Sequence, residues 1–210
     1  MKRLTCISMA GNPLADLTWF KGGVKVEGTT TIKDDGDYSK SELTLIANRT
    51  DNGLEYTCEA SNPATPDPKK TSMTLAVRFK PAWVKTSVSP ESPKAGKKAV
   101  LTCESGSSNP TATIVWRYNG QRLQGSDELV KAGDYGGNVT VNLLEIDVTP
   151  EHQGAVFICE AKNLELQQSV HDAETLVVKC KCSSRYFGIY IVCLLVCLSV
   201  PTMYVCLFVF

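Results

Sequence analysis

The chain has 210 residues and carries 22 Lys and Arg residues against 22 Asp and Glu residues, so its formal net charge is zero. A neutral chain offers no electrostatic basis for binding nucleic acid, and this length allows one or two domains. The charges are unevenly spread, because residues 186–210 contain none.

The first half of the chain contains three segments in which every second residue is apolar. These positions are Ala15, Leu17 and Trp19, then Leu43 and Leu45, then Tyr56, Cys58 and Ala60. A period of two places such side chains on one face of a strand. Gly22-Gly23 and Asn62-Pro63 separate the segments as turn signals. We therefore predict short strands with one buried face, and no helix of useful length.

The second half of the chain repeats this pattern. Cys6 and Trp19 recur 97 residues later as Cys103 and Trp116, and the run from Asn12-Pro13 to Trp19 recurs from Asn109-Pro110 to Trp116. At a shift of 101, the pairs are Leu43 and Leu144, Leu45 and Ile146, Tyr56 and Phe157, Cys58 and Cys159, and Ala60 and Ala161. The longer shift predicts an insertion in the second unit, between its tryptophan strand and its Leu-x-Ile strand.

Many short alternating strands separated by regular turns are typical of a β-sandwich. Two cysteines about fifty residues apart, with a tryptophan between them, favour the immunoglobulin type of sandwich. The fold class that we predict is all-β, with two tandem immunoglobulin-like sandwiches followed by an apolar C-terminal segment. The expected ranges are 1–79 for the first domain, 80–180 for the second domain and 186–210 for the apolar segment.

The sequence resembles the immunoglobulin superfamily over nearly all of residues 1–180. Two Cys-x12-Trp pairs, each with a later (Tyr/Phe)-x-Cys, carry the resemblance, and the short cysteine spacing favours I-set or C2-type domains. The motifs Asn-Pro-x-Ala-x-(Leu/Ile)-x-Trp and Cys-Glu-Ala-x-Asn resemble the nephrin group, which includes the insect proteins sticks-and-stones and hibris. The second motif runs from Cys58 to Asn62 and from Cys159 to Asn163.

The resemblance implies one disulfide in each domain, with a tryptophan packed against it in the core. The implied disulfides are Cys6 with Cys58 and Cys103 with Cys159, and the core tryptophans are Trp19 and Trp116. Such disulfides require an oxidising compartment. The chain has nine cysteines, so at least one is unpaired or pairs outside the chain.

The family motif Asp-x-Gly-x-Tyr-x-Cys is altered in both domains. The aspartate position holds Asn52 or Gln153, and the glycine comes one place early, as Gly53 or Gly154. We therefore do not expect the loop ion pair that this aspartate makes in the family. Tyr56 holds the tyrosine-corner position in the first domain, whereas Phe157 has no hydroxyl to make that hydrogen bond.

The start of the first domain is short. Cys103 lies 23 residues after the expected domain start at Lys80, whereas only five residues precede Cys6. We therefore expect the first strand of this domain to be missing. No apolar run of a secretory signal follows Met1-Lys2-Arg3. Together these features indicate a fragment of a longer protein or an incomplete gene model.

Residues 186–210 form an uncharged run that is long enough to span a bilayer as a helix. A transmembrane helix is our first expectation, with both domains outside the cell membrane in a single-pass arrangement. The positive-inside tendency argues against it, because basic residues precede the run: Lys179, Lys181 and Arg185. The alternatives are a lipid-anchor signal, for which the polar spacer is absent, and an aberrant C-terminus without a selected role.

Residues that could support catalysis or metal binding are sparse. His152 and His171 stand in no Ser/His/Asp or zinc pattern, and we interpret both as surface residues. With no glycine-rich phosphate loop either, we predict no enzyme activity, no cofactor and no metal site. Two sequons, Asn48-Arg49-Thr50 and Asn138-Val139-Thr140, predict N-glycosylation of Asn48 and Asn138 in an extracellular chain.

The nephrin-group resemblance implies a cell-surface adhesion protein that binds other immunoglobulin-superfamily proteins at cell–cell contacts, homophilically or heterophilically. We expect an exposed sheet face or edge to make these contacts, with charge from residues such as Lys21 and Arg117. The alternative is a signalling or decoy receptor with the same fold. An intracellular filament module conflicts with the paired cysteines, the sequons and the apolar tail. Nucleic acid is not an expected partner.

Overall fold

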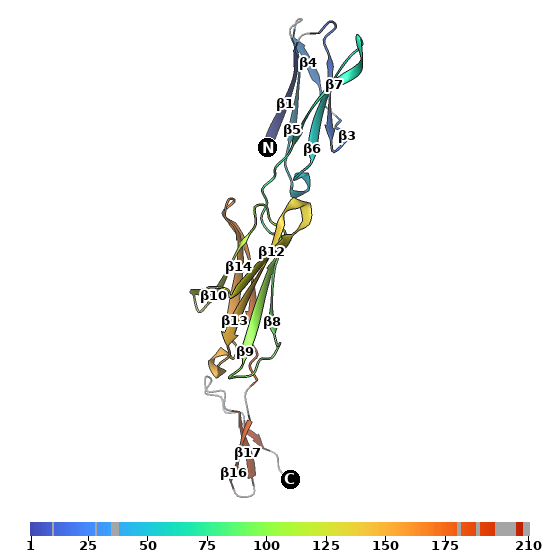
Figure 1. Cartoon of the computed structure of the whole chain (residues 1–210). Helices are drawn as coiled ribbons and strands as arrows, with labels where there is room; N and C mark the ends of the chain where they lie inside the picture. Colours follow the sequence, from blue (N-terminus) through green and yellow to red (C-terminus); the bar gives the residue numbers. More distant parts are fainter. Residues whose placement is uncertain are drawn as a thin grey trace. The chain divides into compact units, whose positions relative to one another are not determined.

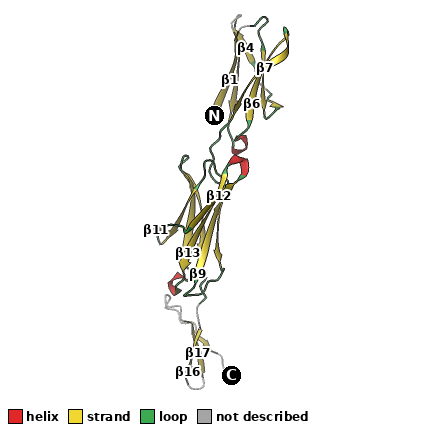
Figure 2. Cartoon of the chain, viewed as in Figure 1, coloured by secondary structure: helices red, strands yellow, loops and turns green. Residues whose placement is uncertain are grey.

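The computed structural model describes residues 1–9, 11–27, 29–34, 38–179, 182–187, 190–195 and 205–207. The chain divides into two compact units, Met1–Phe79 and Lys80–Phe210 (Figure 1). Strands dominate both units (Figure 2). The helices of the described residues are three one-turn 3-10 helices, η1 (Arg49–Asp51), η2 (Asp134–Gly136) and η3 (Pro150–His152). The all-β prediction is therefore confirmed.

The first unit is a sandwich of two antiparallel sheets. One sheet has the order β1 (Lys2–Met9), β5 (Tyr38–Leu45), β4 (Thr31–Asp34). The other has the order β3 (Val24–Lys25), β2 (Asp16–Lys21), β6 (Glu55–Asn62), β7 (Thr65–Thr74).

The sandwich of the second unit has the same arrangement with one strand more. One sheet has the order β12 (Asp127–Ala132), β13 (Asn138–Asp147), β9 (Lys98–Ser105), β8 (Val84–Ser89). The other has the order β11 (Gln121–Leu123), β10 (Thr113–Tyr118), β14 (Val156–Asn163), β15 (Gln168–Thr175). Strand β12 has 6 residues where β4 has 4, so the expected insertion partly lengthens this strand.

The additional strand β8 pairs with the edge of β9, from Val84 opposite Ser105 to Ser89 opposite Val100. In the first unit, β1 corresponds to β9, and no strand of the described residues pairs with its outer edge. The backbone groups of Lys2–Met9 that point outward therefore lack a sheet partner within the described part of this unit.

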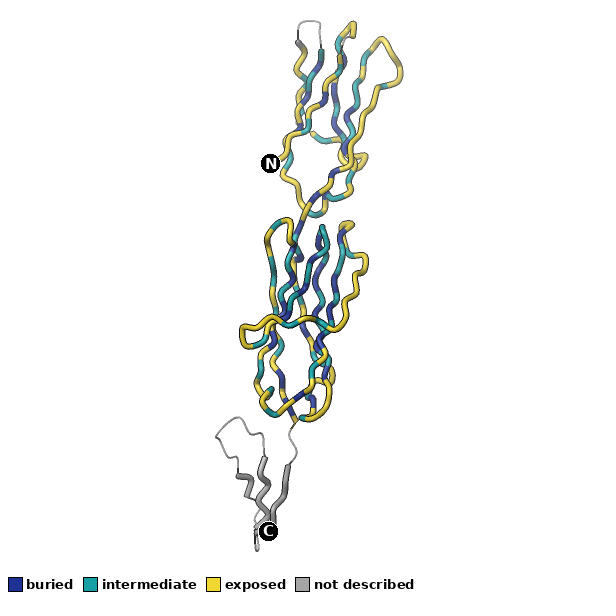
Figure 3. Tube along the Cα trace, turned by 60° about the vertical axis from the view of Figure 1, so that its left-hand side comes forward, coloured by how far each residue is buried: buried dark blue, intermediate teal, exposed yellow. Residues whose placement is uncertain are grey.

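Alternation along the strands builds both cores. Buried and exposed residues alternate along much of the chain trace (Figure 3). In β9, every second residue is buried, and Leu101 and Cys103 are each 0% exposed. The buried faces of the two sheets meet, as expected for a sandwich. Disulfides join the sheets in both units, Cys6 to Cys58 from β1 to β6 and Cys103 to Cys159 from β9 to β14. Trp19 and Trp116 are buried beside them.

The C-terminal segment contains three short antiparallel strands, β16 (Cys182–Phe187), β17 (Tyr190–Leu195) and β18 (Val205–Leu207). Among the residues that the structure describes, no helix is both long and apolar enough to cross a membrane. Residues 188–189, 196–204 and 208–210 lie outside the described residues. The helix expected over 186–210 therefore stays a prediction.

Candidate functional site

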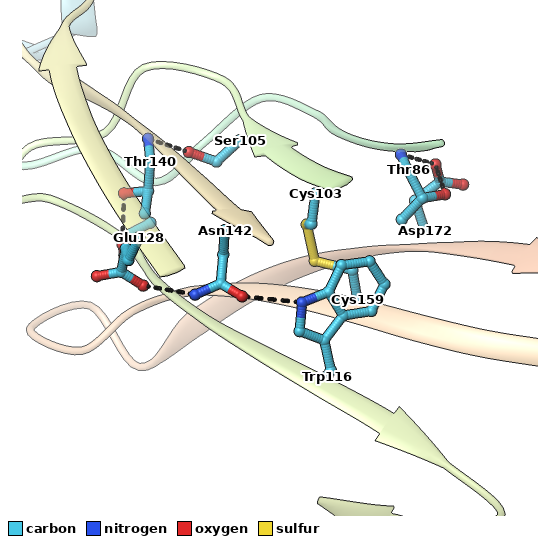
Figure 4. Close-up of a disulfide and its surroundings, with 10 residues drawn as sticks. Thr86, Cys103, Ser105, Trp116, Glu128, Thr140, Asn142, Cys159 and Asp172 are labelled. Carbon is cyan, nitrogen blue, oxygen red and sulfur yellow. Dashed lines mark hydrogen bonds between the residues drawn. A yellow bond between two sulfur atoms is a disulfide. The ribbon is translucent and has the colours of Figure 1, made fainter. Parts of the chain in front are cut away.

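Each core tryptophan donates its indole N–H to a polar side chain on the facing sheet. Trp19 Nε1 lies 3.2 Å from Ser41 Oγ, and Trp116 Nε1 lies 2.9 Å from Asn142 Oδ1. Ser41 and Asn142 are 101 positions apart, so they are equivalent in the repeat. Asn142 in turn donates to Glu128 at 3.0 Å (Figure 4). Buried polar groups need such partners, so the structure assigns the tryptophans to the core rather than to a ligand site.

The two motifs that resemble the nephrin group meet at one end of each sandwich. Asn62 donates its side-chain amide to the carbonyl of Pro13, and Asn163 does the same to Pro110 at 3.1 Å. Asn163, which is 0% exposed, also donates to Ser108 Oγ at 3.0 Å. The motifs therefore tie the loop that follows the first cysteine strand, β1 or β9, to the end of the second cysteine strand, β6 or β14. Their role is structural.

The turn before β6 contains an ion pair that the sequence motif did not lead us to expect. Asp51 Oδ1 lies 2.5 Å from Lys21 Nζ, and the Asp51 side chain is 5% exposed. Its Oδ2 accepts the backbone N–H of Asn48 at 2.8 Å. The expectation of no loop ion pair was therefore wrong for the first unit, because its acid lies one residue before the motif position, just as the glycine does.

This pairing shifts both pKa values. The hydrogen bond with Lys21 lowers the pKa of Asp51, with further lowering from the Asn48 N–H and from Tyr56. The hydrogen bond with Asp51 raises the pKa of Lys21, with a contribution from Tyr56. Lys21 thus belongs to this turn and does not supply a free charge for the outer face.

In the second unit, three rings occupy the same positions. Tyr118, His152 and Phe157 correspond to Lys21, Asp51 and Tyr56 at the two repeat shifts. Tyr118 stacks on Phe157 with ring centroids 4.6 Å apart, and His152 packs edge-on to both rings. His152 Nδ1 also accepts the backbone N–H of Thr149. The interpretation of His152 as a plain surface residue is therefore corrected, whereas His171 is exposed on β15.

Asn52 and Gln153, at the altered motif position, tie this turn to the segment that follows the last strand of the sandwich, β7 or β15. Asn52 Oδ1 accepts the N–H of Val77 at 2.8 Å, and Gln153 Oε1 accepts that of Val178 at 2.7 Å. The following glycines have positive φ values of 77° at Gly53 and 74° at Gly154, a region that glycine adopts without strain. An amide one residue before the glycine replaces the aspartate of the family motif as an acceptor.

The outer face of β10, β14 and β15 carries an exposed apolar centre. Val115 is half-buried there, and Val156 and Ile158 are 45% and 38% exposed. The register puts Val115 beside Glu160 and Ile158 beside Arg117, and Arg117 Nη2 lies 3.5 Å from Glu160 Oε2. A small apolar area bordered by paired charges has the composition of a protein-binding face.

The corresponding face of the first unit is more polar. Phe20 lies on it opposite Thr57, and Thr57 and Ser72 form a hydroxyl hydrogen bond of 2.8 Å. Lys70 Nζ lies 2.5 Å from Glu59 Oε1 on the same face. The face of the second unit is therefore the better candidate for apolar contact.

The two sequons differ in their surroundings. Asn48 is exposed and its Oδ1 accepts the N–H of Arg49 at 2.7 Å as the N-cap of η1. Asn138 is half-buried and donates its Nδ2 to Thr111 Oγ1 at 2.9 Å. Thr140 of the second sequon is 0% exposed and donates to the Ala112 carbonyl at 2.7 Å.

No group of three or more His, Cys, Asp or Glu residues able to hold a metal ion occurs in the part of the chain that the structure describes. Cys180, one of the nine cysteines, lies outside that part.

Two models of the immunoglobulin domain match the chain, one over residues 1–71 and the other over residues 83–163. The chain belongs to the immunoglobulin superfamily. This immunoglobulin-superfamily chain is 31% identical to mouse nephrin over 75% of its own length and 12% of nephrin. It is 26% identical to human cell adhesion molecule 2 over 82% of its own length and 40% of that protein. It is thus a nephrin-like member of the superfamily, as predicted.

The fold also matches the crystal structure of Rst D1-D2, with a TM-score of 0.57, 21% identity and coverage of 85% of this chain and 92% of that chain. Of these relatives, human cell adhesion molecule 2 is named for cell adhesion. The immunoglobulin-superfamily chain spans 12% of the length of mouse nephrin.

Proposed function

We propose that the chain belongs to a cell-surface adhesion or recognition protein and binds immunoglobulin-superfamily ectodomains at cell–cell contacts. One observation carries the proposal: the exposed apolar centre of Val156 and Ile158 on the outer face of β10, β14 and β15, bordered by Arg117 and Glu160. A partner face with a matching apolar centre would remove these side chains from water, and its charges would fix the orientation. The name of one relative, human cell adhesion molecule 2, supports the same class of function.

The exposed apolar centre is small, so we expect a single contact to be weak. Many copies on one cell surface act together, and effective concentration then raises the overall strength of attachment. The protein thus acts by binding and carries out no catalysis in this proposal.

A bead-binding assay tests this function. The full chain is reconstituted in liposomes and offered to beads that carry either the same chain or related immunoglobulin-superfamily ectodomains. We expect clustered chain to attach to at least one bead type, and the bead type distinguishes homophilic from heterophilic binding. Ile158→Asp should lower attachment about tenfold or more, because it places a charge in the apolar centre.

The matched control is Leu129→Asp. Leu129 is 61% exposed on β12, in the opposite sheet, so this variant introduces the same charge on a face outside the proposal. It should attach as well as the parent chain. Attachment to neither bead type, with both disulfides formed, would contradict the adhesion proposal, and equal loss in both variants would contradict the choice of face.

The proposal includes anchoring of the protein in the cell membrane by residues 186–210, supported by their uncharged apolar sequence. A chain expressed with an added secretory signal should remain with the membrane pellet after alkaline extraction. Deletion of residues 186–210 should release the domains into the medium. Release of the full chain by alkali would contradict the anchor.

The proposal also includes a glycan on Asn48 in preference to Asn138. The Asn48 side chain is exposed, whereas the Asn138 amide nitrogen is already a donor to Thr111 in a half-buried position. In the same secreted preparation, Asn48→Gln should abolish most of the mass that deglycosylating enzyme removes, and Asn138→Gln should change it little. The reverse result would contradict this assignment.

A further inference from the structure

The outer face of β10, β14 and β15 carries more positive than negative charge. Arg122 of β11, the strand that borders this face, lies opposite Arg117 of β10. On β14, Lys162 lies two positions beyond Glu160 and opposite Thr113. Buried residues alternate with these positions on β10 and β14, so all four charged side chains lie on the outer face.

No acid of the neighbouring strand β15 offsets these charges. Asp172 and Glu174 lie opposite Cys159 and Phe157, whose side chains are buried in the core. The two acids therefore belong to the core side of the sheet and not to its outer face. Along the four strands of this sheet, the outer face thus has three Lys or Arg residues and one Glu.

Two of the three cations have no anionic partner. Arg117 Nη2 lies 3.5 Å from Glu160 Oε2, whereas the side chains of Arg122 and Lys162 form no ion pair with any described residue. Like charges directly opposite each other on neighbouring strands repel, and Arg122 faces Arg117 in this way. An acidic group from another molecule would relieve this repulsion and supply the missing partners.

We propose that the partner at this face is a different immunoglobulin-superfamily protein, whose docking face has a net negative charge. The inference rests on the proposed function and specifies its partner. Acidic side chains of that partner would lie against Arg122 and Lys162, at two borders of the apolar centre of Val156 and Ile158. Complementary charge of this kind speeds the encounter and rejects unsuitable partners.

A second copy of the same face does not meet this requirement. In a two-fold symmetric contact, the same patch of both copies meets. Such a contact would gather three cations for every acid, and each Glu160 is already engaged with Arg117. Arg122 and Lys162 of both copies would lose water without gaining an anion, which costs free energy. Contact between identical copies through this face is therefore disfavoured.

The apolar centre favours a protein over another polyanion. A sulfated polysaccharide could also bind Arg122 and Lys162, but it has no apolar surface to cover Val156 and Ile158, which are 45% and 38% exposed. A folded protein face supplies both an apolar centre and charged borders. The occupant is therefore a protein, and the polysaccharide is a competing outcome of the test.

The test extends the bead assay. Liposomes carry the full chain, and beads carry the same chain, heparin, or related immunoglobulin-superfamily ectodomains, mouse nephrin and human cell adhesion molecule 2 among them. We expect attachment to at least one ectodomain and none to the same chain. Because salt screens charges, attachment should fall about tenfold between about 50 and 500 mM NaCl.

Arg122→Glu reverses one of the unpaired charges and leaves the apolar centre unchanged. It should lower attachment to the ectodomain about fivefold or more. The matched control is Lys85→Glu, because Lys85 is exposed on β8 in the opposite sheet. This variant changes the net charge of the chain by the same amount, and it should attach as well as the parent chain.

Three outcomes would overturn the inference. Attachment to same-chain beads that Ile158→Asp abolishes would show that the face binds its own copy. Attachment to an ectodomain that changes neither with salt nor with Arg122→Glu would show that the partner needs no acidic face. Attachment to heparin beads alone would assign the cations to a polysaccharide. The first two outcomes leave the adhesion proposal standing, whereas attachment to no protein bead contradicts that proposal itself.

Discussion

At the scale of single residues, the ion pair between Asp51 and Lys21 gives the first unit a charged turn. Asp51 is nearly buried, with its side chain 5% exposed, whereas the Lys21 side chain is 43% exposed. Solvent therefore screens the pair from one side, and its contribution lies between that of a surface pair and that of a buried pair.

We expect Asp51→Asn to lower the free energy of unfolding of the first unit by about 1–2 kcal/mol at neutral pH. Urea denaturation followed by hydrogen exchange of first-unit peptides measures this. The control is Asp16→Asn, because Asp16 pairs with Lys33 where both side chains are well exposed, at 69% and 43%. This variant should cost about 0.5 kcal/mol or less.

The same pair predicts a dependence on pH. The pKa of Asp51 is lowered from 3.8, so its contribution is present above that value and is lost as the pH falls through the folded pKa. The pKa of Lys21 is raised from 10.5, so its contribution is present below that value and is lost as the pH rises through the folded pKa. The difference between the parent chain and Asp51→Asn should therefore shrink in acid. A difference that stayed constant down to the acid transition would contradict the ion-pair account.

At the scale of strands, Asp172 connects β8 in one sheet to β15 in the other through two hydrogen bonds to Thr86. We expect Asp172→Ala to speed exchange of the β8 amides about tenfold, because hydrogen bonds to a charged group contribute about 1.5–3 kcal/mol. The Thr86 contacts lower the pKa of Asp172, so the connection should weaken in acid.

Glu174, two residues further along β15, provides the control for this variant. Glu174→Ala should leave exchange of the β8 amides unchanged. If both variants loosened β8 equally, a general weakening of β15 would explain the result and the specific role of Asp172 would be excluded.

Strands were predictable from sequence because their signal is local. The alternation of Leu17 and Trp19, and of Tyr56 and Cys58, fixes which face is buried without any knowledge of the partner strand. The turn before β6 was not predictable in the same way, because Lys21 and Asp51 lie on separate segments and the motif is shifted by one residue. The ring cluster around His152 was missed for the same reason. Mapping the turn through both repeat shifts would have brought each set of three positions together.

The sequence predicted that a sheet face with charged residues would make the contact, but it did not identify the apolar residues of that face. Arg117 was noted as a charge beside the core tryptophan strand, but the apolar centre with Ile158 arises when β10 and β14 pair in their observed register.

At the scale of the whole chain, the two units differ in how completely their cores are covered. Leu101 and Trp116 are each 0% exposed, whereas in the first unit the equivalent Leu4 is half-buried and the equivalent Trp19 is 4% exposed. We expect the first unit to open with a lower free energy than the second, so that its slowest amides exchange faster.

Hydrogen exchange on the full chain, with peptides assigned to each unit, measures this difference. The amides around Cys6 and Cys58 are compared with those around Cys103 and Cys159, since the disulfides mark equivalent positions. Equal protection at these positions would show that β1 needs no further strand to complete the first core.

The ion pair in one unit and the ring cluster in the other also restrict which segments of the two repeats are compatible with each other. Lys21 and Tyr118 lie on one segment of their repeats, and Asp51 and His152 lie on a later one. A crossover between these segments would set Lys21 against a histidine, or Tyr118 against a nearly buried carboxylate without its cation. Each turn is therefore a matched set of residues, and a domain that combined the two sets would lose both the ion pair and the ring cluster, although the flanking strands have the same pattern.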